Sequence, residues 1–402
     1  MTRILPLAWL LLACLPTSAQ QLWIVDDQPG PQVDFLVIQD AVDAAGPADV
    51  IVVQSGTYDS FIVDGKSALV TGDGLVQVRS CRVRNLGAGD SVVLQGLSFY
   101  PQNTSGFSVH LSSSAGTLLI DDCELRSGFS FASAYQAALI AEDSGSVVIS
   151  HSTLSGQIGS YPGEGVHAIG PCAIALYGST VLAGNGMWET SGRNAITYGD
   201  GTSLHIVGCD LKGGDGGWTD IESWGWCSYP GGGGWILGSG FFNPTMPPQL
   251  YWADNVATPG LGGDSYCGDT SPPGQVAVWP QFVLVSEAQE QVGLTLLSPI
   301  SDTDAVQLTL KGKAGASVFL AVAGDPDFLE LPGLPGLLFA DPTSAMLLPL
   351  GSSGPNGIVN QVWPAPLDLP PGMGLSLVLQ GVFLDAAGID LGSPAALVVT
   401  GS

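Results

Sequence analysis

Short apolar runs separated by glycine-rich turns recur along the first two thirds of the chain. Five of them read VVLQGLSF, TLLIDDCEL, SVVISHSTL, AIALYGSTV and SLHIVGCDL. Their matching apolar positions are Leu97, Leu125, Leu154, Val181 and Leu211, at steps of 28, 29, 27 and 30 residues. WILGSGF continues the series at Phe241. A fixed period of this size is typical of a solenoid, and runs this short predict strands.

A second apolar run precedes four of these segments. These runs read FSVHL, AALIA, VHAI and NAITY. Each coil should therefore contain at least two strands, one tight turn and one longer loop. Because stacked coils repeat every ~4.8 Å, the longer loops should lie side by side on one flank.

The opening segment has a different periodicity. Apolar residues recur there at helical spacing, and they are Phe35, Ile38, Ala41, Val42 and Ala45. This spacing predicts one amphipathic helix over residues 35–45, followed by a buried strand at residues 50–53.

The run IQDAVDAA…DVIVVQSGTY…LVTGDG, within residues 22–74, resembles the opening of right-handed parallel β-helix proteins of the pectin-lyase-like superfamily. The resemblance implies an all-β ladder whose first coil is capped by a short helix. It implies no single activity, because the superfamily includes lyases, hydrolases, esterases and non-enzymes.

The periodic pattern ends in a proline- and glycine-rich stretch. Eight short strand-like runs follow without any helical segment, which predicts a small antiparallel β-sandwich. The expected organisation is a parallel β-helix domain at 20–262, a linker at 263–281 and a β-sandwich at 282–402.

The N-terminus predicts export. Arg3 precedes the apolar run 4–13, and small residues end at Ala19, which is typical of a signal peptide spanning residues 1–19. The alternative is a lipoprotein anchored through Cys14, since Leu-Leu-Ala-Cys resembles a lipidation site. No later segment has the length of a membrane span. The expected location is extracellular or at the cell surface.

The net charge of the chain limits the classes of partner that it can bind. The chain has 36 acidic and 10 basic residues, and loss of Arg3 changes the formal charge from −26 to −27. Such a surface repels nucleic acid and anionic lipid. We expect a monomer whose partner is a polysaccharide or a cell-envelope surface.

Six cysteines follow the predicted cleavage site. Cys227 and Cys267 lie in glycine-rich stretches, and we expect them to form a disulfide. We expect the other four to be buried thiols, and they are Cys81, Cys123, Cys172 and Cys209. The four histidines lie near predicted strands and should be structural; they are His110, His151, His167 and His205.

Every long loop holds an aromatic residue, and the last three also hold acids. Aromatic rings stack on sugar rings and carboxylates bind hydroxyl groups, so we expect a binding groove along the loops. Its candidate ligand-binding residues are Tyr161, Glu164, Trp188, Trp218, Trp224 and Trp226. The alternative for each ring is packing onto the coil beneath it.

Catalytic signals are incomplete. The polygalacturonase-like and pectate-lyase-like patterns of the superfamily are missing, and Arg193 and Lys212 are the only basic residues beside the expected groove. Candidate catalytic residues are Glu189, Arg193, Asp220 and Glu222. Calcium is a possible cofactor, with Asp215 and Asp220 as candidate ligands in glycine loops.

Three functions remain open. The first is a non-catalytic exported protein that binds polysaccharide or a cell-surface component through the stacked loops. The second is a divergent polysaccharide lyase or glycoside hydrolase. The third is a structural or adhesive component of the cell envelope.

Overall fold

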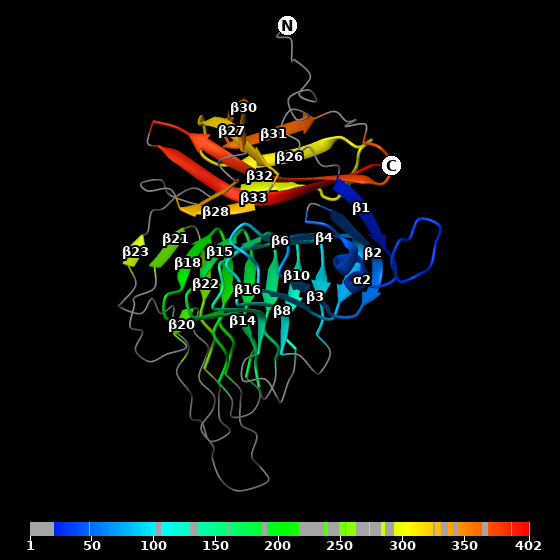
Figure 1. Ribbon diagram of the computed structural model, residues 1–402. Helices are drawn as coiled ribbons and strands as arrows, with labels where there is room; N and C mark the ends of the chain where they lie inside the picture. The colour runs from blue at the N-terminus through cyan, green and yellow to red at the C-terminus, as the bar shows by residue number, and fades with distance from the viewer. Residues whose placement is uncertain are drawn as a thin grey trace.

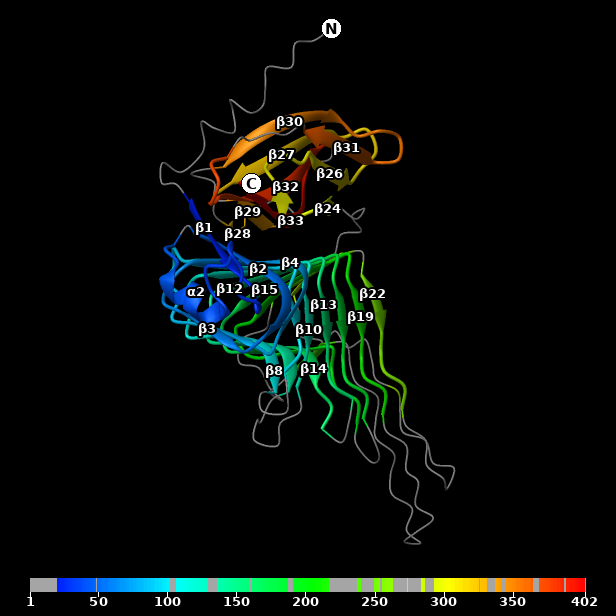
Figure 2. The ribbon, with the colours of Figure 1, turned by 90° about the vertical axis from the view of Figure 1, so that its right-hand side faces the viewer.

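A computed structural model shows an all-β chain in which a parallel β-helix carries an antiparallel β-sandwich (Figures 1 and 2). The model describes residues 20–47, 49–101, 106–128, 136–158, 161–186, 191–216, 237–239, 249–253, 255–262, 273, 283–285, 293–324, 326–330, 337–340, 345–363, 369–386 and 388–401.

Each full coil of the ladder contains three strands. Sheet 1 is made of β1 (Gln20–Val25), β2 (Val50–Tyr58), β4 (Ala68–Val78), β6 (Ser91–Gln95), β9 (Thr117–Asp121), β12 (Ser146–Ser150), β15 (Ala173–Tyr177), β18 (Ser203–Val207), β21 (Gln249–Ala253) and β23 (Val283–Val285). Sheet 2 is made of β7 (Ser98–Phe99), β10 (Glu124–Arg126), β13 (Thr153–Ser155), β16 (Thr180–Leu182), β19 (Asp210–Lys212) and β22 (Val256–Thr258). Sheet 3 is made of β3 (Phe61–Asp64), β5 (Cys81–Arg84), β8 (Phe107–Ser112), β11 (Ala137–Glu142), β14 (Glu164–Ile169), β17 (Ile196–Tyr198) and β20 (Leu237–Ser239).

Parallel pairing in register stacks identical side-chain positions of successive coils. One inward row is 0% exposed throughout, and it comprises Val70, Leu94, Ile120, Ile149, Leu176 and Ile206. Burial of such rows removes apolar surface from water along the whole ladder and is its main stabilising term.

The predicted coil period is confirmed over the middle coils. Leu125, Leu154, Val181 and Leu211 are stacked in register. Two assignments were wrong at the ends of this series.

At the first coil, Phe99 rather than Leu97 pairs with Leu125. Both are buried, so the apolar pattern could not choose between them. At the other end, Leu211 pairs with Ala257. The segment WILGSGF instead supplies β20 of sheet 3, and Phe241 lies outside the described residues.

Between sheets 1 and 2 each coil turns through one residue with positive φ. This position is glycine in three coils, but Asp122 (φ 50°) and His151 (φ 49°) occupy it in two. The turn is held by stacked side chains. Ser152 Oγ accepts the N–H of Cys123 and donates to Ser150 O, at 3.0 and 2.7 Å. These side-chain hydrogen bonds satisfy buried backbone groups that are not paired between strands.

The N-terminal end of the ladder is closed by α2 (Ile38–Ala44), which confirms the expected capping helix. Its buried face consists of Ile38, Ala41 and Val42. The Lys66 ammonium donates to two carbonyl oxygens at the C-terminal end of this helix, those of Val42 and Ala45.

The C-terminal region is a β-sandwich of two layers plus one short hairpin, and the strands of each layer pair in antiparallel fashion except β25, which pairs in parallel with β33. The inner layer is made of β25 (Ile300–Ser301), β27 (Ser317–Ala323), β30 (Met346–Ser352), β32 (Met373–Leu384) and β33 (Ile389–Thr400). The outer layer is made of β24 (Gly293–Leu296), β26 (Val306–Lys311) and β31 (Ile358–Trp363). The hairpin is β28 (Pro326–Glu330) with β29 (Leu337–Ala340).

The inner layer of the sandwich packs directly on the outer face of sheet 1 (Figure 1). Apolar side chains of the ladder, including Leu119 and Val148, form one cluster with Ala396 and Val398 of β33. Strand β1 joins both parts, because it pairs in parallel with β2 and antiparallel with β32. We call this contact between sheet 1 and the sandwich the seam.

The sequence predicts the sandwich as a separate domain behind the ladder, and the structure shows that the sandwich is docked along sheet 1. The reason lies in β32 and β33, which are buried on both faces over most of their length. The expected boundaries at 262 and 281 stay predictions, although β23 at 283–285 still pairs in parallel with β21.

Candidate functional site

The long loops leave sheet 2 and return into sheet 3, so their roots lie along one edge of the ladder (Figure 2). The described roots include residues 156–158, 161–163, 183–186, 191–195 and 213–216. We call these roots, together with the outer face of sheet 3, the loop flank.

Backbone hydrogen bonds join the roots of successive loops. Gly184 N–H donates to Gly163 O at 2.8 Å, Arg193 N–H to Gly184 O at 3.1 Å, and Gly214 N–H to Arg193 O at 2.9 Å. The register of the ladder therefore continues into the loops.

Glycine is required where these roots cross. A Cβ on Gly184 would lie 1.8 Å from the carbonyl oxygen of Gln157, and a Cβ on Gly192 would lie 1.8 Å from that of Gly214. Real Cβ atoms do not approach backbone so closely, so only glycine permits this contact.

Of the two described members of the predicted ligand-binding set, Tyr161 is exposed, with 53% of its surface accessible. It lies in the root of the third loop, beside Pro162. Arg193 Nε donates to the carbonyl of Pro162 at 3.1 Å, so this arginine ties the fourth loop to the third. That contact gives Arg193 a positioning role.

Glu164 differs from its expected place in a loop. It is the first residue of β14, it is 7% exposed, and its carboxylate accepts a hydrogen bond from His167 Nδ1. Residues i and i+3 of a regular strand face opposite sides. Here Gly165 and Val166 N–H both donate to Ala195 O, at 3.1 and 3.0 Å, so the start of β14 departs from regular hydrogen bonding, and Glu164 lies beside His167.

A second histidine–glutamate pair lies on the same outer row of sheet 3. Register places His110, Ile140 and His167 in line across three coils, so the two histidines are ~10 Å apart. His110 Nε2 donates to Glu142 at 3.1 Å. Burial lowers the pKa of His110, although the charge of Glu142 acts in the opposite direction.

Such pairs have a defined chemical capacity. A carboxylate that accepts from one imidazole nitrogen fixes the tautomer and leaves the other nitrogen as a base or hydrogen-bond acceptor. The sequence predicted these histidines to be structural, and its apolar pattern gave no signal that Glu164 would lie beside His167.

Asp215, a predicted calcium ligand, has its carboxylate oxygens engaged by the protein. Oδ1 accepts the N–H of Leu261 at 2.8 Å, and Oδ2 lies 3.4 Å from Asn185 Nδ2 and 3.9 Å from the ammonium of Lys212. This arrangement fixes the root of the fifth loop. Within the described ranges, no three His, Cys, Asp or Glu side chains gather as a metal site.

The other predicted site residues lie outside the described residues, and the structure does not bear on them. They are Trp188, Glu189, Trp218, Asp220, Glu222, Trp224, Trp226, Cys227 and Cys267.

The remaining four cysteines are free and buried, as expected from the sequence; they are Cys81, Cys123, Cys172 and Cys209. Burial raises the pKa of Cys172 to about 11, which keeps this thiol protonated at neutral pH. Over the part of the chain that is described, no helix is long and apolar enough to span a bilayer.

Comparisons with known proteins add the following. No protein-family model and no curated protein matches the chain. Among solved structures it is similar to the tailspike protein gp49 of Acinetobacter baumannii bacteriophage Fri1, described as a capsular polysaccharide depolymerase. That likeness covers 93% of this chain and 84% of the tailspike at 9% identity with a TM-score of 0.24, and values this low carry no argument about function.

Proposed function

We propose that this is an exported β-helix protein that binds an extended polysaccharide, or another glycan of a cell surface, along the loop flank. The observation that carries the proposal is the hydrogen-bonded stacking of the loop roots at Gly163, Gly184, Arg193 and Gly214. It brings loops that are 27 to 30 residues apart in sequence onto one edge, each with an aromatic residue.

A row of this kind suits a linear glycan. Tyr161 offers an exposed ring on which a sugar can stack, and the tryptophans of the fourth and fifth loops extend the row in the sequence. The strongly acidic chain favours neutral or weakly charged sugars over polyanionic ones.

Retention on immobilised polysaccharides and a glycan array test the proposal. Tyr161→Ala, Trp218→Ala and Trp224→Ala should each weaken glycan retention. Leu347→Ala, at a 59% exposed position of the sandwich, is the matched control and should retain wild-type binding. Unchanged retention in all three aromatic variants would contradict a groove on the loop flank.

A second candidate function is cleavage of the bound glycan, as a divergent polysaccharide lyase or glycoside hydrolase. The observation that favours it is the buried contact between Glu164 and His167 beneath the loop roots. An imidazole oriented by a carboxylate can act as general base.

Assays for unsaturated products and for new reducing ends, over neutral and acidic polysaccharides with calcium present, test cleavage. Product that disappears in His167→Ala while binding persists would establish the enzyme. Absence of product from every glycan that is bound supports the non-catalytic function. Absence of both binding and product would favour the structural or adhesive alternative.

A further inference from the structure

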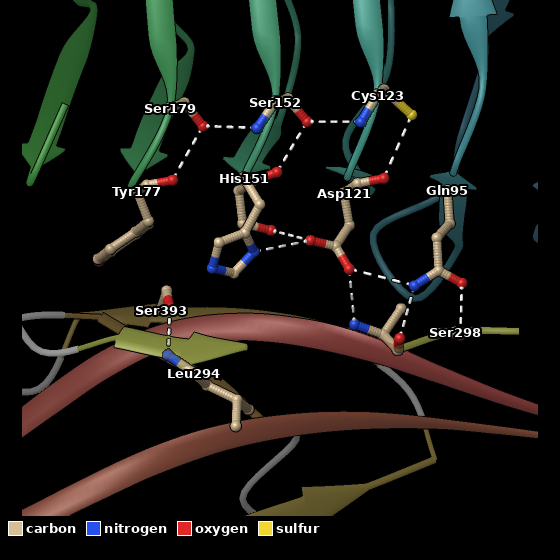
Figure 3. Close-up of polar contacts among 12 residues, drawn as sticks. Gln95, Asp121, Cys123, His151, Ser152, Tyr177, Ser179, Leu294, Ser298 and Ser393 are labelled. Atoms are coloured by element: carbon tan, nitrogen blue, oxygen red, sulfur yellow. Dashed lines mark hydrogen bonds and ion pairs between the residues drawn. The ribbon is translucent and has the colours of Figure 1, made fainter. Parts of the chain in front are cut away.

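The seam contains a buried polar network centred on one carboxylate. Asp121 is 3% exposed and accepts four hydrogen bonds. Ser150 Oγ and His151 Nδ1 donate to Oδ1 at 2.8 and 3.1 Å, while Gln95 Nε2 and the N–H of Ala396 donate to Oδ2 at 3.2 and 3.1 Å. Figure 3 shows Asp121 between His151 and Gln95.

The network also uses every hydrogen-bonding site of Gln95. Its Nε2 donates to Ala396 O at 2.6 Å as well as to Asp121, and its Oε1 accepts from Thr71 Oγ1 at 3.2 Å and from Ser298 Oγ at 2.9 Å. Ser298 Oγ in turn accepts the N–H of Val398 at 2.9 Å. A fully paired buried network fixes one relative position of the two surfaces.

These contacts satisfy backbone groups at one edge of β33. Strand β25 pairs with β33 only at Val399 and Thr400, so the edge of β33 at Ala396 has no neighbouring strand there. Asp121 and Gln95 take its N–H and its C=O. Side chains of the ladder therefore stand in for the missing strand, and they hold the sandwich on the ladder.

The geometry points to a pH-responsive latch, in which the Asp121 carboxylate and the His151 imidazolium hold the sandwich on sheet 1. All four bonds to Asp121 come from donors. The His151 imidazolium adds a charge-assisted bond to this set, and its loss weakens the anchor that Asp121 provides for β33.

The His151 imidazole determines the pH above which the latch weakens. Burial lowers the pKa of His151, but its bond to Asp121 and the charges of Asp121 and Asp122 outweigh this and raise the pKa above the ordinary histidine value. A raised pKa in the folded state contributes stability below the ordinary value, and this contribution is lost as pH rises through the raised value. The latch is therefore tighter below the raised pKa of His151 than above it.

Tyr177 also lies near the latch. It follows Ser150 in the same row, and burial raises its pKa well above its ordinary value, so it stays neutral. From β33 and the segment before β25, the network receives only neutral groups, those of Ala396 and Ser298.

Hydrogen–deuterium exchange of the β33 peptide tests the latch, with protection corrected for intrinsic exchange between about pH 4 and pH 9. We expect protection to fall roughly tenfold or more as pH rises through the raised pKa of His151, as for the loss of one charge-assisted hydrogen bond. Protection of the β27 peptide, which pairs within the sandwich, should not follow this curve.

A variant tests the contribution of His151. His151→Asn should flatten the fall of protection with rising pH, since asparagine tolerates the positive φ at this turn. The control Asp210→Asn, at an exposed position of β19, should keep the wild-type curve. A wild-type β33 curve without pH dependence overturns the latch, and this measurement needs no variant to fold. A full alkaline fall of protection in His151→Asn overturns it as well.

Discussion

The ladder has two outer faces built from the same coils, and the outward side chains of these two faces have different roles. In the coil of β9 to β11, Leu119 faces the sandwich from sheet 1, and Ile140 lies on the outer row of sheet 3. Both are nearly buried, at 1% and 4% exposed. The seam uses its polar groups to fix one docked arrangement. The loop flank keeps histidine–glutamate pairs beneath the roots of loops that differ from coil to coil.

The largest effect is expected from a substitution that removes packing at the seam. Leu119→Ala should lower the free energy of unfolding by about 2–5 kcal/mol, because it leaves a cavity between two packed surfaces. Urea denaturation measures the loss, and exchange at β33 should rise with it. The matched variant Ile140→Ala in the same coil should lose stability without raising exchange at β33. If both variants raise β33 exchange equally, the two faces are not independent.

Part of this contrast between the two faces could be predicted from the sequence. The rest depends on contacts between residues that are far apart in the chain. The period of Leu125, Leu154, Val181 and Leu211 predicted the ladder, since stacking demands equal coil lengths. The run AALVVTG in β33 is apolar at consecutive positions, which is typical of strands buried on both faces. It was interpreted only as a sandwich strand, so the docking was missed.

The candidate site was less accessible to sequence reasoning. The loop flank followed from the coil period, and Tyr161 is exposed there as a binding residue requires. Glu164 was predicted to lie in a loop, and it is instead the first residue of β14, where its carboxylate contacts His167. Apolar periodicity contains no signal for a polar residue at the start of a strand.

A smaller effect is expected at the loop roots. Gly184→Ala should cost about 1–3 kcal/mol, because the new methyl group meets the carbonyl of Gln157 and the root must shift. Thermal unfolding and glycan retention should both decline. Gly89→Ala, where a Cβ meets nothing within 4 Å, is the control and should stay within about 1 kcal/mol of wild type. Wild-type binding by Gly184→Ala would show that the stacked roots do not shape the binding edge.

The two histidine–glutamate pairs allow a comparison within the loop flank. Glu164→Gln should cost about 1–3 kcal/mol, because both partners are buried and one loses its charged acceptor. Glu142→Gln should cost less than about 1 kcal/mol, because the Glu142 side chain is 37% exposed and water replaces the bond. Chemical denaturation of both variants gives the two values. Equal losses would mean that burial does not distinguish the pairs.

The last comparison is between two histidines of the seam whose contributions to the free energy of unfolding should respond to pH with opposite sign. His205 is stacked on Tyr251 at 4.1 Å, and burial lowers its pKa to about 3. A lowered folded-state pKa contributes stability above the ordinary histidine value, and this is lost as pH falls toward the lowered value. The loss should be on the order of 1 kcal/mol per pH unit below about pH 6. His205→Phe keeps a ring in the stack and should flatten this slope, whereas His151→Asn should leave it intact and alter only the alkaline side. Unfolding free energies of both variants across this range measure the two slopes, and an unchanged acid slope in His205→Phe would assign it to the carboxylates instead.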